Sequence, residues 1–383
     1  MYSTRILTVL LLPLAFFAPA CQAQLGKNVT IPAGSEVDHQ LSAINAADPS
    51  QRLQLIDLFA QSHPEDDLQI IADEQYVNYY VDAKQYDKAF EYGDKLIALD
   101  PDNYSNALNM IRAANEKGDT DKLYAYGEKA NAILQRYKAS PAPAGTDADS
   151  WARTKADKLA SLKDDQGYIQ QSLLSAAYNV KDPAQKAGYL QSFAKMVPDS
   201  PQGEQALTMA ASFYQQAQNR AKMQEVANAV LAKDPDDVGI LLLLADDYSE
   251  RGEQLDKAEA YAKKAASLAD SAKKPENLSD DQWKQQTSIQ KGLAFSALGQ
   301  IDLARKQNAL AVASLTKAAP LLKSNATLYA RNQYRLGFAY LNLKKNVEAK
   351  QAFTEAASVD SPYKGPAQQK LSEIGAAKPA PHK

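Results

Sequence analysis

The 383-residue sequence predicts an all-α protein, built as a right-handed α-solenoid of helix–turn–helix repeats. Three observations point to this fold. Apolar residues return every three or four positions through most of the chain, which is the period of an amphipathic helix. Beyond Gln24, alternating apolar and polar runs are almost absent and β-branched residues are sparse. Short segments with Pro and Asp then interrupt the pattern, so the helices must be short.

The interrupting segments mark where helices end. They read LDPDN at 99–103, VPDSP at 197–201 and KDPDD at 233–237. Because proline lacks a backbone N–H and disfavours helix at the residue before it, each segment ends one helix. The Asp or Asn that follows can cap the next helix.

The composition is that of an ordinary globular protein, with 45% hydrophobic and 23% charged residues. Lys and Arg number 43 against 46 Asp and Glu, so there is no basic excess to neutralise phosphates. This balance argues against nucleic acid as a partner. One Cys excludes a disulfide framework or a multi-Cys metal site, and three His leave little for zinc. We therefore expect no cofactor and no metal.

Small and aromatic residues recur at fixed places in units of ~34 residues. In the unit 330–363, Gly337, Tyr340, Ala349 and Phe353 take positions 8, 11, 20 and 24. This pattern resembles the tetratricopeptide repeat, which implies small residues where two helices approach and aromatics in the space between them. The resemblance covers most of 33–363 and implies about seven hairpins. It is clearest at 70–103, 285–318 and 330–363, and weaker at 104–137, 168–201, 204–237 and 238–272.

A longer duplication lies on top of the short repeat. Residues 48–64 read DPSQRLQLIDLFAQSHP and residues 182–198 read DPAQKAGYLQSFAKMVP, an offset of 134 residues from Asp48 to Asp182. The same offset relates Tyr80 to Tyr214. We infer that a block of about three hairpins was duplicated, as repeat arrays grow.

Residues 1–23 are predicted to be a signal peptide. One charge, Arg5, precedes the apolar run from Ile6 to Ala18, which is short for a membrane span and ends in a small-x-small pattern. Cys21, the only cysteine, follows directly, where a bacterial lipoprotein signal places its lipidated Cys. The alternative is ordinary cleavage that leaves Cys21 unmodified or removes it. Either way we expect an extracytoplasmic protein, most simply a periplasmic one, with anchoring to the outer membrane if Cys21 is lipidated.

The rest of the chain divides at a Pro/Ala-rich loop. Repeats are expected over 24–138 and 151–373, with the loop at 139–150 between them and a disordered tail at 374–383. Each copy of the duplication enters such a loop before a tryptophan, Trp151 or Trp283. The sequence SDDQ at 279–282 is a capping-box pattern that starts a helix. The tryptophans either pack a long helix onto the preceding hairpin or form exposed anchors for a partner.

The sequence offers little for catalysis. It contains no GxxxxGK[ST], GxSxG, HExxH or CxxC motif. Acidic pairs recur, but most sit at turns where Asp caps a helix and favours its dipole. Asp246-Asp247 is the exception, placed in mid-helix where adjacent side chains point to different faces. The chain is therefore not expected to be an enzyme.

The resemblance also implies a concave groove lined by the first helix of each hairpin. This surface is mixed and polar, suited to an extended peptide or a helix. Arg331 and Arg335 lie one turn apart and could grip one carboxylate of a partner in a fork. The alternative is a solvated pair or surface ion pairs. The predicted partner-binding residues are Asn78, Asn109, Arg112, Gln290, Arg331, Tyr334 and Arg335.

These observations favour a non-catalytic scaffold or adaptor of the periplasm or cell envelope, which binds a partner protein or peptide in the groove. The alternative is an outer-membrane-associated lipoprotein that acts as an assembly factor or chaperone. Contact with a membrane is expected only through the anchor at Cys21, and contact with nucleic acid is not expected. A catalytic subunit is the third hypothesis, and it has the least support.

Overall fold

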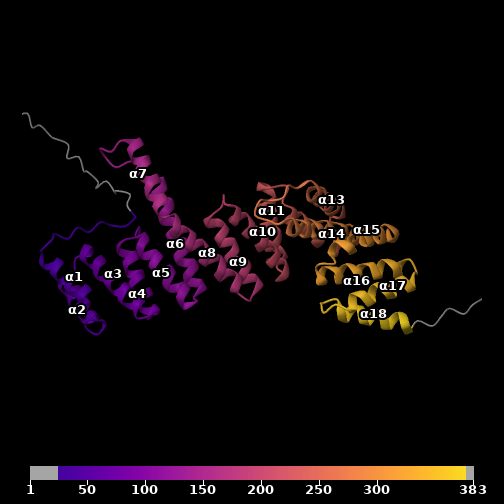
Figure 1. Cartoon of the computed structure of the whole chain (residues 1–383), viewed down its shortest axis with the longest axis horizontal. Coiled ribbons are helices and arrows are strands. Elements are labelled where there is room, and N and C mark those ends of the chain that lie inside the picture. Colours follow the sequence, from indigo (N-terminus) through magenta and orange to yellow (C-terminus); the bar gives the residue numbers. More distant parts are fainter. Residues whose placement is uncertain (1–24, 377–383) are drawn as a thin grey trace, which may run out of the picture. The chain divides into compact units, whose positions relative to one another are not determined.

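The computed structural model describes residues 25–376, which form eighteen α-helices and no strand (Figure 1). The fold is the all-α helical repeat solenoid that the sequence predicts. The signal peptide, Cys21 and nearly all of the predicted tail lie outside the described residues. Among the helices of this region, none is long and apolar enough to cross a membrane.

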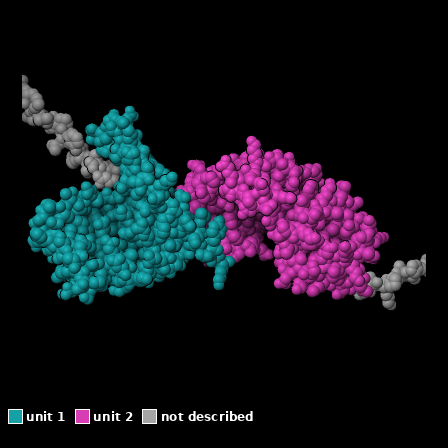
Figure 2. Space-filling view, viewed as in Figure 1, with its two compact units in different colours: residues 1–181 teal, residues 182–383 magenta. Residues whose placement is uncertain are grey.

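The chain divides into two compact units, residues 1–181 and 182–383 (Figure 2). The boundary falls where the second copy of the duplication begins. It therefore divides the single block of repeats that was predicted at 151–373. The helices of unit 1 are α1 (Glu36–Ala46), α2 (Pro49–Ser62), α3 (Asp66–Asp82), α4 (Tyr86–Leu99), α5 (Tyr104–Lys117), α6 (Thr120–Ala139), α7 (Ala148–Ser161) and α8 (Lys163–Asn179).

Unit 2 contains the remaining ten helices of the described region. They are α9 (Pro183–Met196), α10 (Pro201–Gln216), α11 (Arg220–Lys233), α12 (Val238–Arg251), α13 (Leu255–Ser271), α14 (Asp280–Ala304), α15 (Asn308–Leu322), α16 (Ala326–Asn342), α17 (Asn346–Ala357) and α18 (Lys364–Ala376). Within each unit, helices pack mainly on their neighbours in sequence, such as α3 on α4 and α16 on α17. Stacking of this kind buries one continuous core.

The duplication is visible in the helix boundaries. Helices α2 and α9 have the same length and lie 134 residues apart, and the same is true of α4 with α11 and of α5 with α12. Even the turns correspond, because Lys84 and Gln218 both have positive φ, 55° and 57°. The helices α2–α5 of unit 1 therefore recur in unit 2 as α9–α12.

Close helix approach depends on small residues at the crossing points. Gly337 on α16 lies against Phe353 on α17, and a Cβ at this position would stand 2.7 Å from Cζ of the phenylalanine. Phe353 is fully buried and packs edge-on against Phe338 and Tyr334. At Gly292, a Cβ would come equally close to Leu322. The position-8 glycines thus have the packing role that the repeat pattern predicts.

The irregular loop is shorter than predicted, because α6 ends at Ala139 and α7 already begins at Ala148. Trp151 packs edge-on against Tyr137, and its indole N–H donates to the Ser140 carbonyl at 3.3 Å. The predicted capping box is confirmed: Ser279 and Gln282 bond reciprocally at the start of α14. Trp151 thus packs a helix onto the preceding one, as the structural interpretation predicts, and Trp283 is half-buried in the first turn of α14.

Replacing Gly337 with Ala is expected to destabilise unit 2 by about 1–3 kcal/mol, because the new methyl group meets a ring that has no room to move. The matched control is Gly188→Ala on α9, where the nearest side-chain atom is 3.9 Å away. That change should be neutral or stabilise by up to ~1 kcal/mol through helix propensity. Denaturant unfolding of the two variants compares them, and equal stabilities would contradict the packing role of Gly337.

Candidate protein-binding surfaces

Arg331 and Arg335 form the predicted fork, but the carboxylate within it belongs to the same chain. Both project from α16 toward Asp246 on α12. Arg331 Nη1 lies 2.7 Å from Asp246 Oδ2, and Arg335 Nη2 lies 2.9 Å from Asp246 Oδ1. A partner's carboxylate would therefore have to displace Asp246 from both arginines.

Arg335 is not a surface residue, since it is only 4% exposed. Its guanidinium also pairs with Glu250 and donates to Ser296 Oγ at 3.0 Å. Burial would lower its pKa, yet the carboxylates of Asp246 and Glu250 hold the pKa above its ordinary value. Neither a solvated pair nor a surface ion pair describes this residue.

Asp246 owes its charge to the two arginines. Burial alone would raise its pKa, but Arg331 and Arg335 outweigh burial and keep the pKa below the ordinary value. The neighbouring Asp247 points to another face of α12, as predicted, where it accepts from Arg220 Nε at 3.0 Å and Arg251 Nε at 3.1 Å. Ion pairs thus hold two faces of helix α12 in place.

Tyr334 belongs to an aromatic cluster. Its ring centroid lies 5.0 Å from that of Phe338 and 5.7 Å from those of Phe353 and Tyr363. The side chain is half-buried against the core of the last hairpins. The position of Tyr334 therefore indicates that its side chain packs within the fold and does not primarily contact a partner.

Unit 1 has a polar cavity of about 320 Å³ at the predicted groove positions. It includes both predicted asparagines, Asn78 and Asn109, and its lining comes from α3, α4 and α5: Glu74, Val77, Asn78, Leu96, Ser105, Asn106 and Asn109. Asn103 donates to Glu74 Oε1 at 3.1 Å at its edge. The sequence register therefore placed these two asparagines together correctly.

The amides in this cavity differ in their bonding. Asn106 is buried and donates to the Gly93 carbonyl at 2.9 Å, so it has a structural role. Asn78 is exposed and Asn109 half-buried, and the side-chain amide of neither forms a hydrogen bond with another residue of the described chain. Each offers both a donor and an acceptor, the same pair that a peptide group presents.

Arg112 lies one turn further along α5 from Asn109. It pairs with Asp165 Oδ1 of α8 at 3.4 Å, and its guanidinium is 5.9 Å from the ring centroid of Tyr168. Asn115 donates to the Tyr168 hydroxyl at 3.4 Å. Asn78, Asn109, Arg112 and Tyr168 together are called the polar surface of unit 1. All four are accessible to solvent.

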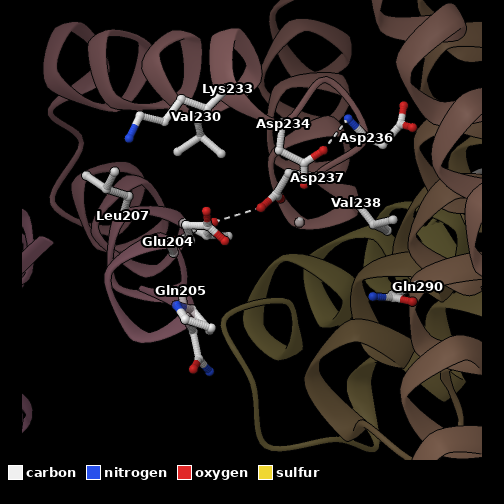
Figure 3. Close-up of a pocket in the computed structure, with 13 residues that line it drawn as sticks. Glu204, Gln205, Leu207, Val230, Lys233, Asp234, Asp236, Asp237, Val238 and Gln290 are labelled. Carbon is white, nitrogen blue, oxygen red and sulfur yellow. Dashed lines mark hydrogen bonds between the residues drawn. The ribbon is translucent and has the colours of Figure 1, made fainter. Parts of the chain in front are cut away.

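Unit 2 has a cavity of about 450 Å³ at the corresponding place, formed by α10, α11 and α12 and reaching Gln290 of α14 (Figure 3). Here Thr208 Oγ1 donates to Asp237 Oδ2 at 2.9 Å. These two residues follow Glu74 and Asn103 by 134 positions, so the equivalent pair is hydrogen-bonded in both copies, with donor and acceptor exchanged. The predicted residue Gln290 does line a cavity, and none of the other lining residues was among the predicted partner-binding residues.

The segment at residues 25–27 lies against the turn between α4 and α5 in unit 1. The Lys27 backbone N–H donates to Asp100 Oδ2 at 2.8 Å, and the Leu25 carbonyl accepts from the Tyr104 N–H at 3.4 Å. Gly26, with a φ of +125°, lets the backbone approach Asp100 closely. Sequence reasoning missed this contact, because nothing in the pattern links residues 25–27 to the start of α5.

In the part of the chain from 25 to 376, no group of three or more His, Cys, Asp or Glu side chains is arranged to hold a metal ion. The recurring acidic pairs instead cap helices or form ion pairs. Asp237 caps α12, for example, and Asp236 pairs with Lys264.

Replacing Arg335 with Ala is expected to destabilise unit 2 by about 3–5 kcal/mol, because Asp246 would lose a partner inside the protein. The control is Arg112→Ala in unit 1, which removes an exposed pair and should change stability by at most ~1 kcal/mol. Thermal and denaturant unfolding test both variants. A loss for Arg335→Ala no larger than that of the control would contradict the structural role.

Asp73 predicts a dependence of unit 1 stability on pH. It is 6% exposed on α3, and burial raises the pKa from 3.8 to about 6, with Lys95 opposing the shift. Because the folded state binds this proton more tightly, the stability it contributes is present below pH ~4 and lost as pH rises through ~6. The loss is about 2–3 kcal/mol.

In the second copy, Leu207 stands where unit 1 has Asp73. Asp73→Leu should therefore raise stability near pH 7 and remove most of its change between pH 4 and 7. Unfolding free energies of the two proteins at several pH values measure this. If the free energy of unfolding of the variant depends on pH as that of the original protein does, groups other than Asp73 cause the dependence.

Comparison with known families gave one match, in which residues 330–363 fit the tetratricopeptide repeat. A comparison with curated proteins found no match. Similar solved structures include a chain of the APC/C hetero-tetramer Cut9–Hcn1, at 13% identity and a TM-score of 0.39. That match covers 88% of this chain and 62% of the other. This chain thus spans less than two thirds of that structure.

Two further structures are similar over most of their length. Yeast Tom70 is 12% identical with a TM-score of 0.31, and 88% of this chain and 94% of Tom70 are covered. The P58(IPK) TPR domain is 13% identical with a TM-score of 0.30, covering 89% of this chain and 98% of that domain. Scores this low assign neither a function nor a partner. Residues 330–363 therefore match a tetratricopeptide repeat, and helical hairpins precede this repeat in the described chain.

Proposed function

We propose that the protein is a non-catalytic scaffold or adaptor of the cell envelope, which binds a partner protein or peptide through the polar surface of unit 1. The observation that carries this proposal is the pair of unbonded amides, Asn78 and Asn109, beside a cavity of about 320 Å³. Such amides can pair with the N–H and C=O groups of an extended chain, which gives affinity without depending on its side chains.

The rest of this surface fits a protein ligand. Tyr168 is 36% exposed, and Arg112 beside it is accessible, and these are residue types enriched where proteins bind tightly. The overall charge of −3 offers no attraction for nucleic acid. Repeats of this family generally mediate contacts between proteins, in agreement with the proposal. A hydrolase or transferase activity that is lost on a single Asp replacement would contradict it.

The proposal predicts that Asn78→Ala/Asn109→Ala abolishes capture of the main partner without unfolding the protein, because both side chains make no internal hydrogen bond that the structure describes. The measurement is an in-cell crosslink of the tagged chain followed by mass spectrometry. Asp164→Ala, an exposed residue outside the surface, is the control.

Arg331→Glu/Arg335→Glu is not a suitable variant for this experiment. It would place two further negative charges against Asp246 and would unfold unit 2 instead of testing binding. The adaptor proposal fails if the Asn78/Asn109 variant and the control capture the same partner equally.

The apolar run from Ile6 to Ala18 supports export of the protein to the periplasm or cell envelope. The position of Cys21 after Ala20 favours a second candidate function, an outer-membrane lipoprotein that acts as an assembly factor or chaperone.

This candidate predicts that Cys21→Ser moves the protein from the membrane fraction to the soluble one, because the lipid attachment site is gone. Fractionation of cells that express each form measures the change, with immunoblotting of a known lipoprotein as a control. Identical fractionation of the two forms would leave only the unanchored scaffold.

A further inference from the structure

One part of the unit 2 cavity, at Asp234 and Val238, is the counterpart of a place where unit 1 binds its own chain. In unit 1, Asp100 and the N–H of Tyr104 hold the extended backbone at residues 25–27. The residues 134 positions later are Asp234 and Val238, and both line the unit 2 cavity. In unit 2, no described residue outside the turn 234–238 forms a hydrogen bond with the Asp234 carboxylate or with the Val238 N–H.

The two groups have the same local geometry in both copies. Asp100 and Asp234 each follow the last residue of a helix, α4 or α11. Tyr104 and Val238 each begin the next helix behind an Asx cap, Asn103 or Asp237. The first N–H groups of a helix have no acceptor within it, so the Val238 N–H is available to donate to a carbonyl oxygen.

The unit 2 copy carries more negative charge. Glu204 is exposed at the edge of the cavity, where unit 1 has the buried Ile70. Of the four lining carboxylates, Asp236 pairs with Lys264 and Asp237 is bonded to Thr208 and to the Ile240 N–H. Glu204 and Asp234 form no ion pair with any described residue. The only lining cation, Lys233, donates to the Pro198 carbonyl at 3.3 Å.

Apolar side chains complete the cavity. Figure 3 shows Leu207 and Val230 near its α10–α11 side and Val238 on its α12 side. A long cationic side chain buries its aliphatic stem against such walls and keeps its charged end near the carboxylates. The site therefore offers contacts for an extended backbone together with a place for one basic side chain.

We propose that this cavity binds an extended segment of a partner protein that carries a Lys or Arg residue. Its backbone N–H donates to Asp234, its carbonyl accepts from the Val238 N–H, and its basic side chain lies beside Glu204. This inference deepens the scaffold function proposed above and rests on it. It names a second surface, on unit 2, and the chemistry of the segment that surface takes.

The chain itself supplies the probe, LGKNVTIP (residues 25–32), because Leu25 and Lys27 of this segment bond to the unit 1 copy. A fluorescent peptide of this sequence is titrated into the purified chain and followed by polarisation. We expect saturable binding that weakens with added salt, since exposed charges are screened. The same peptide with Glu in place of its Lys should bind about tenfold more weakly.

Three protein variants locate the site. Glu204→Gln/Asp234→Asn should weaken binding about tenfold, while the amide of Asn still accepts from the Asp236 N–H. Glu276→Gln/Asp281→Asn makes the same charge change on exposed residues of unit 2 outside the cavity, and should bind like the original protein. Asp100→Asn alters the unit 1 copy and should also leave the affinity unchanged.

Absence of saturable binding overturns the inference, as does equal binding by the Glu204/Asp234 variant and its control. If only Asp100→Asn weakens peptide binding, the peptide displaces the chain's own segment in unit 1. That result also overturns the inference. Partner capture that still depends on Asn78 and Asn109 would then leave the scaffold function standing. Absence of both peptide binding at the unit 2 cavity and partner capture through Asn78 and Asn109 would contradict both proposals.

Discussion

The structure depends on one constraint: a hairpin of two short amphipathic helices cannot bury its apolar face alone. Each hairpin must share its core with the next, and the helices must approach closely. Gly337 against the buried ring of Phe353 shows how this is achieved, with a missing side chain on one helix and a large one on the other. Once the core is committed to stacking, the outward positions of the first helices are free to carry polar residues such as Asn78 and Asn109.

Unit 2 adds a second constraint, the buried charge on α12. Asp246 and Asp247 are adjacent in sequence, but each is held by its own pair of arginines. A buried carboxylate is costly unless it is paired, so these contacts maintain the position of α12 relative to α11 and α16. They also explain why Arg331 and Arg335, whose spacing predicts that they bind a partner's carboxylate, instead stabilise the fold.

The duplication produced two sites with the same geometry and different chemistry. The bond between Asn103 and Glu74 recurs as that between Thr208 and Asp237, so both cavities lie at equivalent places. In unit 1 the carboxylate of Asp100 is satisfied by the chain's own backbone and the cavity presents amides. In unit 2 the equivalent Asp234 is bonded only within its own turn, and carboxylates dominate the cavity. The two copies have thus diverged in the polar groups that they present.

The sequence by itself determined the helices, many of their caps, the repeat at 330–363 and the duplication, because these follow from periodicity and local backbone chemistry. It also placed Asn78 and Asn109 on one surface, since both occupy positions of a first helix that are predicted to line the groove. It did not determine which side chains are already bonded within the fold. Asp246 and Arg331 are 85 residues apart, and Lys27 and Asp100 are 73 apart. The first contact joins two helices, α16 and α12, and the second joins the segment before α1 to the turn after α4. Because such contacts exist only once the hairpins have stacked, only the tertiary structure decided which polar groups remain free for a partner.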